Sequence, residues 1–325
     1  MREQWCIRVP RAGAELARQD LRSRGLLDMG LRPRQEGDWV LFPVREACEG
    51  AVRGEFEPLP PPPDLPRHEL IGGIAVLQDE DREGAERLLA SRPSLHTALY
   101  PLGDVEGEYR TRRFLVLAGK DTTETLYREH GLLFSIDLAE AYFSPRLSTE
   151  RQRVLGLARP GERVLDMFSG VGPFALTLAR KASLVVACDL NPGAVRLLER
   201  NIRRNRARNV LPVFSDAARL PAILPWTFDR IVMNLPLGAA RFLPVAASLS
   251  RPGTTVHVYA LEEEEGQFLP AIRDAFPVRE VTERYVRSYA PGRWHAVYDV
   301  VVGEEERGKR GTGFCPGVTI TGKKE

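Results

Sequence analysis

Apolar runs of strand length alternate with amphipathic stretches of helical spacing throughout the second half of the chain. The strand-like runs are 164–168, 184–188, 211–216, 228–234 and 254–261, followed by two closing strands near 278–286 and 294–301. The stretches with helical spacing are 173–182, 191–205, 239–250 and 266–275. Such alternation specifies a parallel, doubly wound sheet, which binds ligands at the carboxyl ends of its strands.

The first half of the chain contains two smaller α/β patterns on either side of a proline-rich segment. Residues 1–57 read as a strand, a helix and a returning strand, and residues 67–140 as several strands around one helix. The segment 58–66 between them contains four consecutive prolines, which favour stiff polyproline II and predict a linker. We therefore expect an α/β protein with one large Rossmann-like sheet over 141–302, two smaller N-terminal α/β domains and a flexible tail over 303–325.

The composition excludes several classes of protein without indicating one function. A formal net charge of +2 over 325 residues is small, so any nucleic-acid surface must be a local patch. The four cysteines are far apart and form no CxxC pair, which argues against a zinc site or a disulfide framework and predicts a reduced, cytoplasmic protein without metal. No apolar run is long enough to cross a membrane, and the first residues lack the apolar core of a signal peptide.

A glycine-rich turn follows the first strand of the large sheet and predicts a nucleoside pocket. Gly170 and Gly172 lie between a strand and a helix, where the absence of Cβ atoms leaves room for an adenosyl-type ligand. The second strand ends at Asp189, a position from which an acid accepts hydrogen bonds from ribose hydroxyls. Asp216 ends the third strand and is placed to meet the amino group of adenine.

The acid before this turn helps to decide which nucleoside ligand binds. Asp166 stands four residues before Gly170, and a carboxylate so close to the turn would repel a pyrophosphate. The same carboxylate suits the sulfonium and ammonium groups of S-adenosylmethionine. Pro173 and Phe174 also depart from the G-x-G-x-x-G spacing of dinucleotide sites. The sequence therefore favours a methyl-donor site over a dinucleotide site, and over a glycine turn that binds no ligand.

The fourth strand ends in Asn234-Leu235-Pro236, which we interpret as the acceptor side of the site. An amide side chain and nearby backbone carbonyls offer fixed donors and acceptors to the edge of a planar base. Asn and Pro also form ordinary turns, but ligands gather at the strand ends of this kind of sheet. We therefore expect this segment to hold a base in line with the donor methyl group.

Five spaced motifs resemble those of the archaeal and eukaryotic tRNA guanosine-37 N1-methyltransferases, over residues 1 to about 301. In chain order they are YFSPRLSTER at 142–151, DMFSGVGPF at 166–174, DLNP at 189–192, MNLP at 233–236 and RSYAP at 287–291. The resemblance implies a class I methyltransferase domain, a middle domain and a mobile N-terminal domain that reads the tRNA elbow. One departure is minor, since Ser169 stands where the family more often has alanine.

The family's chemistry implies roles that spacing alone does not assign. Guanine N1 carries a proton, so its methylation needs a base for that proton and a cation or donor for the charge on the exocyclic oxygen. By resemblance, Glu150 is that base and Arg110 stabilises that oxygen, although on spacing alone Glu150 fits a capping-box acid or a solvated charge better. Asn234 and Pro236 would clamp the base edge, and Tyr142 would pack on the flipped nucleotide.

In full, the resemblance and the strand-end positions imply three groups of site residues. The catalytic residues are Arg110, Glu150, Asn234 and Pro236; the substrate-binding residues are Tyr142 and Arg146; and the cofactor-binding residues are Asp166, Phe168, Gly170, Gly172, Asp189, Leu190, Asp216 and Asn234. The implied cofactor is S-adenosyl-L-methionine. The implied partner is tRNA, with its anticodon loop at the catalytic domain and its elbow at the N-terminal domain. One chain carries a complete set of motifs, so we expect a monomer.

Three alternatives remain at this point. A wybutosine-pathway aminocarboxypropyltransferase would act on the same tRNA position with the same donor, although Pro173-Phe174 and Asn234-Leu235-Pro236 speak against it. A methyltransferase could also act on a tricyclic wyosine intermediate, which the sequence does not decide. A tRNA-binding factor with an inactive donor pocket is disfavoured while Glu150, Asp166 and Asp189 are all present.

Overall fold

The computed structural model describes residues 1–59, 64–106, 111–304 and 318–321. It divides into two compact units, Met1–Leu65 and Pro66–Glu325. The division falls within the predicted linker, of which residues 60–63 lie outside the described part of the chain. Among the described helices, none combines the length and the apolar character that crossing a membrane requires.

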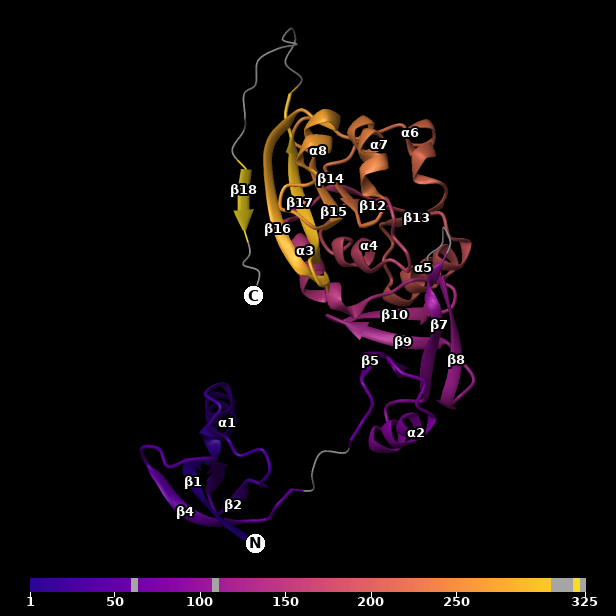
Figure 1. The fold of residues 1–325 in the computed structure, drawn as a ribbon. Helices are drawn as coiled ribbons and strands as arrows, with labels where there is room; N and C mark the ends of the chain where they lie inside the picture. Colours follow the sequence, from indigo (N-terminus) through magenta and orange to yellow (C-terminus); the bar gives the residue numbers. More distant parts are fainter. Residues whose placement is uncertain (60–63, 107–110, 305–317, 322–325) are drawn as a thin grey trace. The chain divides into compact units, whose positions relative to one another are not determined.

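The N-terminal unit is a four-stranded antiparallel sheet in the order β2-β3-β1-β4, with one helix (Figure 1). Its elements are β1 (Arg2–Pro10), the 3-10 turn η1 (Arg11–Gly13), α1 (Ala14–Ser23), β2 (Arg34–Glu36), β3 (Trp39–Val44) and β4 (Ala51–Phe56). Two small cores stabilise it, one around Cys6 and Phe56 and one around Leu21 and Phe42. Strand β4 was not predicted, because Gly54 and two charged residues interrupt its apolar pattern.

The chain after the linker forms a second four-stranded sheet and a hairpin. The sheet has the order β5-β6-β7-β8, with β6 parallel to β7 and the outer pairs antiparallel. The elements are β5 (His68–Ile71), β6 (Ile74–Leu77), α2 (Arg82–Ser91), β7 (Thr97–Glu106), β8 (Thr111–Gly119) and the hairpin strands β9 (Glu124–Glu129) and β10 (Leu132–Asp137). Helix α2 begins after Asp81, whose carboxylate accepts a hydrogen bond from the amide of Gly84.

The largest sheet has the order β13-β12-β11-β14-β15-β17-β16-β18 (Figure 1). Its strands are β11 (Arg163–Asp166), β12 (Leu184–Asp189), β13 (Val210–Phe214), β14 (Arg230–Met233), β15 (Thr255–Glu262), β16 (Val278–Ala290), β17 (Arg293–Val302) and β18 (Val318–Thr321). Its helices are α3 (Ser148–Leu157), α4 (Pro173–Leu178), α5 (Pro192–Asn205), α6 (Leu220–Ile223), α7 (Leu243–Ser248) and α8 (Leu269–Ala275), with the 3-10 turns η2 (Pro145–Leu147), η3 (Ala217–Arg219) and η4 (Ala239–Phe242). Strands β11 to β15 are parallel, and β17 joins them antiparallel. This arrangement confirms the predicted α/β class and its Rossmann-like sheet.

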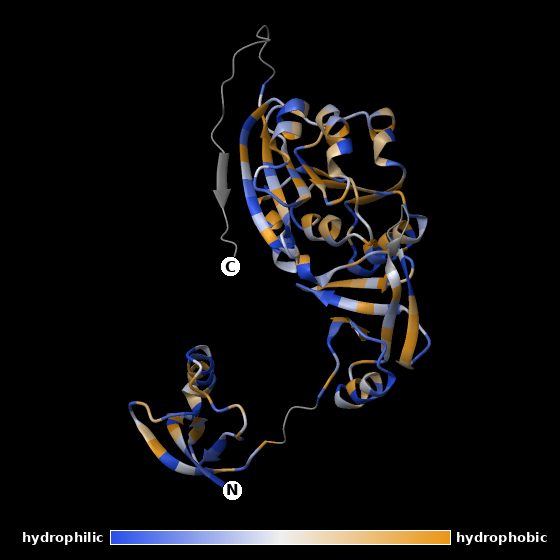
Figure 2. Ribbon diagram, viewed as in Figure 1, coloured by the Kyte–Doolittle hydropathy of each residue, from blue (hydrophilic) through white to orange (hydrophobic). Residues whose placement is uncertain are grey.

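Side chains of the central strands alternate between two hydrophobic cores, one on each face of the large sheet. Val164 of β11 belongs to the core that contains residues of α3, α4 and α5. Its neighbour Leu165 belongs to the core that contains residues of α6, α7 and α8. Figure 2 shows the hydrophobic colouring concentrated in the central strands, while β16 carries many hydrophilic residues. Burial on both faces explains why these strands are continuous apolar runs in the sequence.

Residues 67–140, predicted as a separate middle domain, share a core with the large sheet. Leu99 of β7 and Phe134 of β10 lie in the same hydrophobic cluster as Phe174 of α4. Asn201 of α5 accepts a hydrogen bond from the Ser135 amide at 2.6 Å and donates one to the Ser135 carbonyl at 3.1 Å. Everything from Pro66 onward is therefore one compact unit.

The segment 303–325, predicted as a flexible tail, contains one described element. Strand β18 pairs parallel with β16, with Val281 opposite Val318. Residues 305–317 and 322–325 lie outside the described part of the chain.

Candidate functional site

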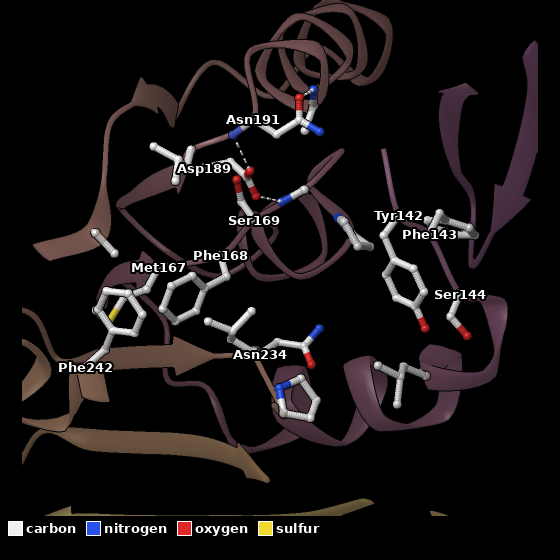
Figure 3. Close-up of a pocket in the computed structure, with 18 of the residues that line it drawn as sticks. Tyr142, Phe143, Ser144, Met167, Phe168, Ser169, Asp189, Asn191, Asn234 and Phe242 are labelled. Atoms are coloured by element: carbon white, nitrogen blue, oxygen red, sulfur yellow. Dashed lines mark hydrogen bonds between the residues drawn. The ribbon is translucent and has the colours of Figure 1, made fainter. Parts of the chain in front are cut away.

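A cavity of about 440 Å³ lies at the carboxyl ends of β11, β12 and β14, where a doubly wound sheet binds its ligands. Figure 3 shows Asp189 and Ser169 on one side of the cavity and Tyr142 and Ser144 on the opposite side. The side chain of Asn234 extends from the end of β14 toward the space between them. The loops that follow β11, β12, β13 and β14 and the segment that precedes α3 thus line a single space.

The glycine turn after β11 is held in a conformation that only glycine adopts readily. Gly170 has φ +53° and Gly172 has φ +92°, both in the left-handed region. A Cβ atom on Gly172 would lie 2.4 Å from Cδ1 of Leu198 in α5, so no larger residue fits unless the buried Leu198 side chain moves. Pro173 then provides the first residue of α4, as is usual at a helix start.

Asp189 connects the glycine turn after β11 to the loop after β12, on the donor side of the cavity. Its Oδ2 accepts a hydrogen bond from the Gly170 amide at 2.7 Å, and its Oδ1 accepts one from the Asn191 amide at 2.9 Å (Figure 3). Burial raises the pKa of this carboxyl, and the amide hydrogen bonds partly offset the effect. Each carboxylate oxygen retains a free lone pair, so two neighbouring hydroxyls could bind here.

Asp166 ends β11 beneath the turn and is only 1% exposed. Neither of its carboxylate oxygens has a well-formed hydrogen bond among the described residues, although the amides of Phe168 and Ala175 face it. Burial, followed by the charge of Asp189, raises the pKa of Asp166 to about 7. Asp166 does not line the cavity, so its influence on a ligand is electrostatic and not a direct contact.

This buried carboxyl predicts a pH-dependent stability. Between its unfolded pKa near 4 and about 7, the folded protein binds the extra proton, so the free energy of unfolding should fall as pH rises through this window. The loss is on the order of 4 kcal/mol, because one pKa unit corresponds to about 1.4 kcal/mol. Asp166→Asn should therefore unfold at a higher temperature than the wild type at pH 8, but not at pH 4. Thermal melts of both proteins would contradict this if the difference did not grow with pH.

The acceptor side of the cavity contains the end of β14 and the segment before α3. Asn234, Pro236 and Tyr142 line the cavity, and Tyr142 is 45% exposed. On the donor side, Phe168 packs edge-on against Phe242, with ring centroids 5.0 Å apart. The predicted site residues that line the cavity are Tyr142, Phe168, Gly170, Asp189, Leu190, Asp216, Asn234 and Pro236.

The other predicted site residues lie elsewhere. Gly172 and Asp166 lie behind the cavity wall, and Arg146 lines a smaller neighbouring cavity instead. Arg146 forms an ion pair there, with 2.9 Å between its Nε and Oε1 of Glu69. Glu150 is 8% exposed and does not line the cavity. Arg110 lies outside the described residues.

Glu150 lies in the first turn of α3 and is an acceptor in a buried network. The Tyr259 hydroxyl donates to its Oε1 at 2.7 Å, and Arg153 donates to both of its oxygens at 2.7 and 2.8 Å. Burial, followed by the charge of Glu150, raises the pKa of Tyr259 well above its usual value, so that the hydroxyl stays protonated. Burial alone would lower the pKa of Arg153, but its hydrogen bonds to Glu150 and Asp299 outweigh burial and leave the pKa raised.

The network continues along the face of the large sheet that α3 covers, from β17 through β15 to β14. Arg153 also donates to Asp299, at 2.5 and 3.1 Å, and His257 Nδ1 lies 2.5 Å from the same carboxylate. Arg230 donates to His257 Nε2 at 2.6 Å, so the imidazole proton is on Nδ1 and is donated to Asp299. Burial would raise the pKa of Asp299, but its partners His257 and Arg153 hold it below its ordinary value.

Sequence reasoning assigned no role to several residues that line the cavity. Arg151, 1% exposed, forms a buried pair with Glu129 of β9, at 2.5 and 2.7 Å. From the β16–β17 hairpin, Tyr289 stacks on His295 with ring centroids 5.4 Å apart. Arg151 and Tyr289 both stand within motifs that carried the family resemblance, so the motifs contained a signal for both positions without assigning them a role.

Two family models and a full-length relative match the chain. Residues 125–280 match the TRM5/TYW2 methyltransferase domain, and residues 6–52 match the tRNA methyltransferase 5 N-terminal domain. The chain is 36% identical to Trm5b of Pyrococcus abyssi, a tRNA (guanine(37)-N(1))-methyltransferase, over 90% of this chain and 97% of the relative. This chain belongs to the Trm5 family of tRNA methyltransferases. The resemblance inferred from the motifs is thereby confirmed.

Solved structures of Trm5 proteins have the same fold. The crystal structure of Trm5b from Pyrococcus abyssi matches with a TM-score of 0.71 and 34% identity, over 93% of this chain and 100% of that chain. A complex of aTrm5 with tRNALeu matches with a TM-score of 0.69 and 25% identity, over 92% and 99%. Another relative, from Methanocaldococcus jannaschii, is a tRNA(Phe) (4-demethylwyosine(37)-C(7)) aminocarboxypropyltransferase, 29% identical over 72% of this chain and 96% of the relative.

The residues of the cavity fit S-adenosylmethionine, on which methyltransferases of the Trm5 family depend. The free lone pairs of Asp189 suit the ribose hydroxyls, and Asp216 lies in the same wall for the adenine amino group. Phe168 and Leu190 line the same cavity and would offer apolar surface to the adenine ring. Above its pKa of about 7, the buried carboxylate of Asp166 adds negative potential that favours a cationic donor.

Proposed function

We propose that this enzyme methylates N1 of guanosine 37 in tRNA, using S-adenosylmethionine as the methyl donor. One observation carries the proposal: a single cavity extends from Asp189 on the donor side to Asn234, Pro236 and Tyr142 on the acceptor side. The match to a guanine-37 N1-methyltransferase over almost the whole chain supports the same acceptor. Because one chain carries both sides of the cavity, we also propose that it acts as a monomer. We propose a cytoplasmic location because its cysteines form no disulfide pattern in the sequence.

Methylation of guanine N1 requires the protein to remove a proton, to stabilise a negative charge and to position the base. When bound, the donor supplies an electrophilic methyl group on a sulfonium sulfur. Guanine N1 becomes a nucleophile only when its proton leaves, and we assign that proton transfer to the carboxylate of Glu150. Arg110 would stabilise the negative charge that then develops on the exocyclic oxygen. Asn234 and Pro236 would fix the base edge in line with the methyl group, while Tyr142 packs on the flipped base.

Glu150 must move to act as this base. In the structure its carboxylate is bound to Tyr259 and Arg153, away from the cavity. It nevertheless lies three residues after Leu147, which does line the cavity, at the start of the same helical segment. We infer that binding of the nucleotide draws the side chain of Glu150 from the network into the cavity. Catalytic hydrogen bonds often form only in the substrate complex, so the observed position is compatible with this role.

An assay with two labelled donors tests the proposed reaction. The enzyme is incubated with unmodified tRNA transcript and S-adenosylmethionine labelled either in the methyl carbon or in the carboxyl carbon. We expect transfer of the methyl label alone, recovered by mass spectrometry as 1-methylguanosine, and none to a transcript with adenosine at position 37. Transfer of the carboxyl label would instead identify an aminocarboxypropyltransferase, the reaction named for one of the relatives.

We further propose that the N-terminal unit contacts the tRNA elbow. Its residues 6–52 match the N-terminal domain of tRNA methyltransferase 5, and an aTrm5 protein has been crystallised with tRNALeu. Two of its arginines stack on tryptophans, Arg8 on Trp39 at 4.5 Å and Arg53 on Trp5 at 4.0 Å, which keeps cationic groups at its surface.

Deletion of residues 1–59 is expected to raise KM for tRNA by about tenfold or more and to leave kcat at saturating tRNA nearly unchanged. A remote contact that is equal in the ground state and the transition state contributes to KM alone. Steady-state kinetics with several tRNAs would measure the effect, and discrimination between them should weaken. A truncated enzyme with full selectivity and an unchanged KM would contradict the role of the unit.

A further inference from the structure

A second cavity, of about 280 Å³, adjoins the nucleoside cavity and shares part of its wall. The shared residues are Tyr142, Phe143 and Ser144. Three arginines line the second cavity, namely Arg112 of β8, Arg146 of η2 and Arg287 of β16, together with one acid, Glu69 of β5. Arginines from three distant parts of the sequence therefore converge on a small space with net positive charge.

Two of these arginines have buried donors that remain unused. Nε of Arg112 and Nε of Arg287 are buried, and neither has a hydrogen-bond partner within the part of the chain that the structure describes. A buried N–H group without a partner is destabilising, and a charged group more so. Arg146 is paired with Glu69 at 2.9 Å, so the acid of this cavity is already engaged. The vacant donors of Arg112 and Arg287 point to an anion that none of the described residues supplies.

The remaining lining of the cavity favours a compact anion over a base or a sugar. Ile71, Val76, Phe114 and Leu138 form its apolar side. A low-dielectric wall strengthens the attraction between guanidinium groups and a charged ligand. The planar guanidinium fork matches the tetrahedral oxygens of a phosphate, which is why arginine is common at such sites. The stretch from Tyr142 to Ser144, which lines both cavities, places this anion directly beside a nucleotide in the larger cavity.

We propose that the second cavity binds a backbone phosphodiester of the tRNA, adjacent to the nucleotide whose base enters the larger cavity. The inference rests on the proposed function, because it takes the flipped nucleotide as the occupant of the larger cavity. Tyr142 separates the two spaces, with the base on one side and the phosphate on the other. Arg112 and Arg287 neutralise the phosphate and so hold the nucleotide outside the stacked loop while its base reacts.

Neutral linkages in the substrate test the site directly. A set of tRNAs is prepared, each with one methylphosphonate replacing one phosphodiester of the anticodon loop, and binding to the full-length enzyme is measured. We expect one linkage beside position 37 to weaken binding by about tenfold or more, with smaller effects elsewhere in the loop. A scan in which no linkage beside position 37 stands out would overturn the proposal. This measurement needs no variant and no methyl transfer.

Variants of Arg112 and Arg287 test whether these two side chains bind the sensitive phosphodiester. Arg112→Met and Arg287→Met should each weaken binding of unmodified tRNA by about tenfold and reduce the slope of log Kd against log salt by about 0.7 per lost contact. On the tRNA with the sensitive neutral linkage, neither variant should cause a further loss. Arg113→Met is the matched control, because Arg113 is the exposed neighbour of Arg112 on the opposite face of β8, and it should retain wild-type binding.

The outcomes separate this site from the proposed function. If the arginine variants lose as much affinity for the neutral-linkage tRNA as for the natural one, they do not contact that phosphate and the proposal is wrong. If the binding pattern holds but wild-type enzyme transfers no methyl group to guanosine 37, the proposed function fails while the phosphate site stands. Affinity for S-adenosylmethionine should be unchanged in both variants, which checks that the fold is intact.

Discussion

Glu150→Gln is expected to lower kcat for tRNA methylation by about two to four orders of magnitude, while KM for tRNA and for S-adenosylmethionine changes little. Positioned general bases contribute roughly 10²- to 10⁴-fold, and an amide cannot accept the N1 proton. The loss should appear in single-turnover rates at saturating tRNA and donor, because the carboxylate acts mainly in the transition state. An enzyme that methylates at the wild-type rate with glutamine at this position would exclude Glu150 as the base.

The buried network requires a control for this substitution. Glutamine can accept from Tyr259 but leaves one donor of Arg153 facing an amide nitrogen, so some stability will be lost in addition to activity. Tyr259→Phe removes one hydrogen bond from the same carboxylate without removing the base, and we expect its kcat to fall by less than about tenfold. If both variants lost activity in proportion to their melting temperatures, the role of Glu150 would be structural.

The fold could be predicted largely because the large sheet is buried on both faces. Val185–Cys188 of β12 and Ile231–Met233 of β14 are buried at every position, so each of these segments is an uninterrupted apolar run in the sequence. Elements at the edges gave weaker signals: β4 has few buried residues and was missed. The shared core of Leu99, Phe134 and Phe174 is a property of tertiary packing, so a boundary at residue 140 was a reasonable prediction from local pattern.

The site was predictable where chain topology fixes position. Asp189 ends β12 and Asn234 follows β14, two parallel strands on either side of β11, and that placement alone brings both residues to one edge of the sheet. The partners of Glu150 could not be found in this way. Tyr259 donates to Glu150, and Asp299 accepts from Arg153, which also pairs with Glu150; they come from β15 and β17, more than a hundred residues after α3, and no spacing rule relates them. That Arg112 and Arg287 line one cavity could not be predicted from the sequence either.

Asp189→Ala is expected to reduce the affinity for S-adenosylmethionine by at least about 100-fold. The carboxylate would accept hydrogen bonds from two ribose hydroxyls, and bonds to a charged group contribute about 1.5–3 kcal/mol each. The variant also loses the bonds from the amides of Gly170 and Asn191, so the glycine turn itself is less well held. Isothermal titration calorimetry of the enzyme without tRNA measures the donor affinity apart from any effect on the acceptor.

The donor affinity of Asp216→Ala is the comparison needed to interpret that of Asp189→Ala. Asp216 would meet the donor through the adenine amino group alone, and its Oδ1 already accepts a hydrogen bond from the Ala218 amide at 2.9 Å. One contact in place of two predicts a loss of about tenfold, well below that of Asp189→Ala. Equal losses in the two variants would mean that Asp189 does not bind both hydroxyls, whereas unchanged affinity in both would place the donor elsewhere. The ordering of the two variants therefore tests the orientation of the donor as well as its presence.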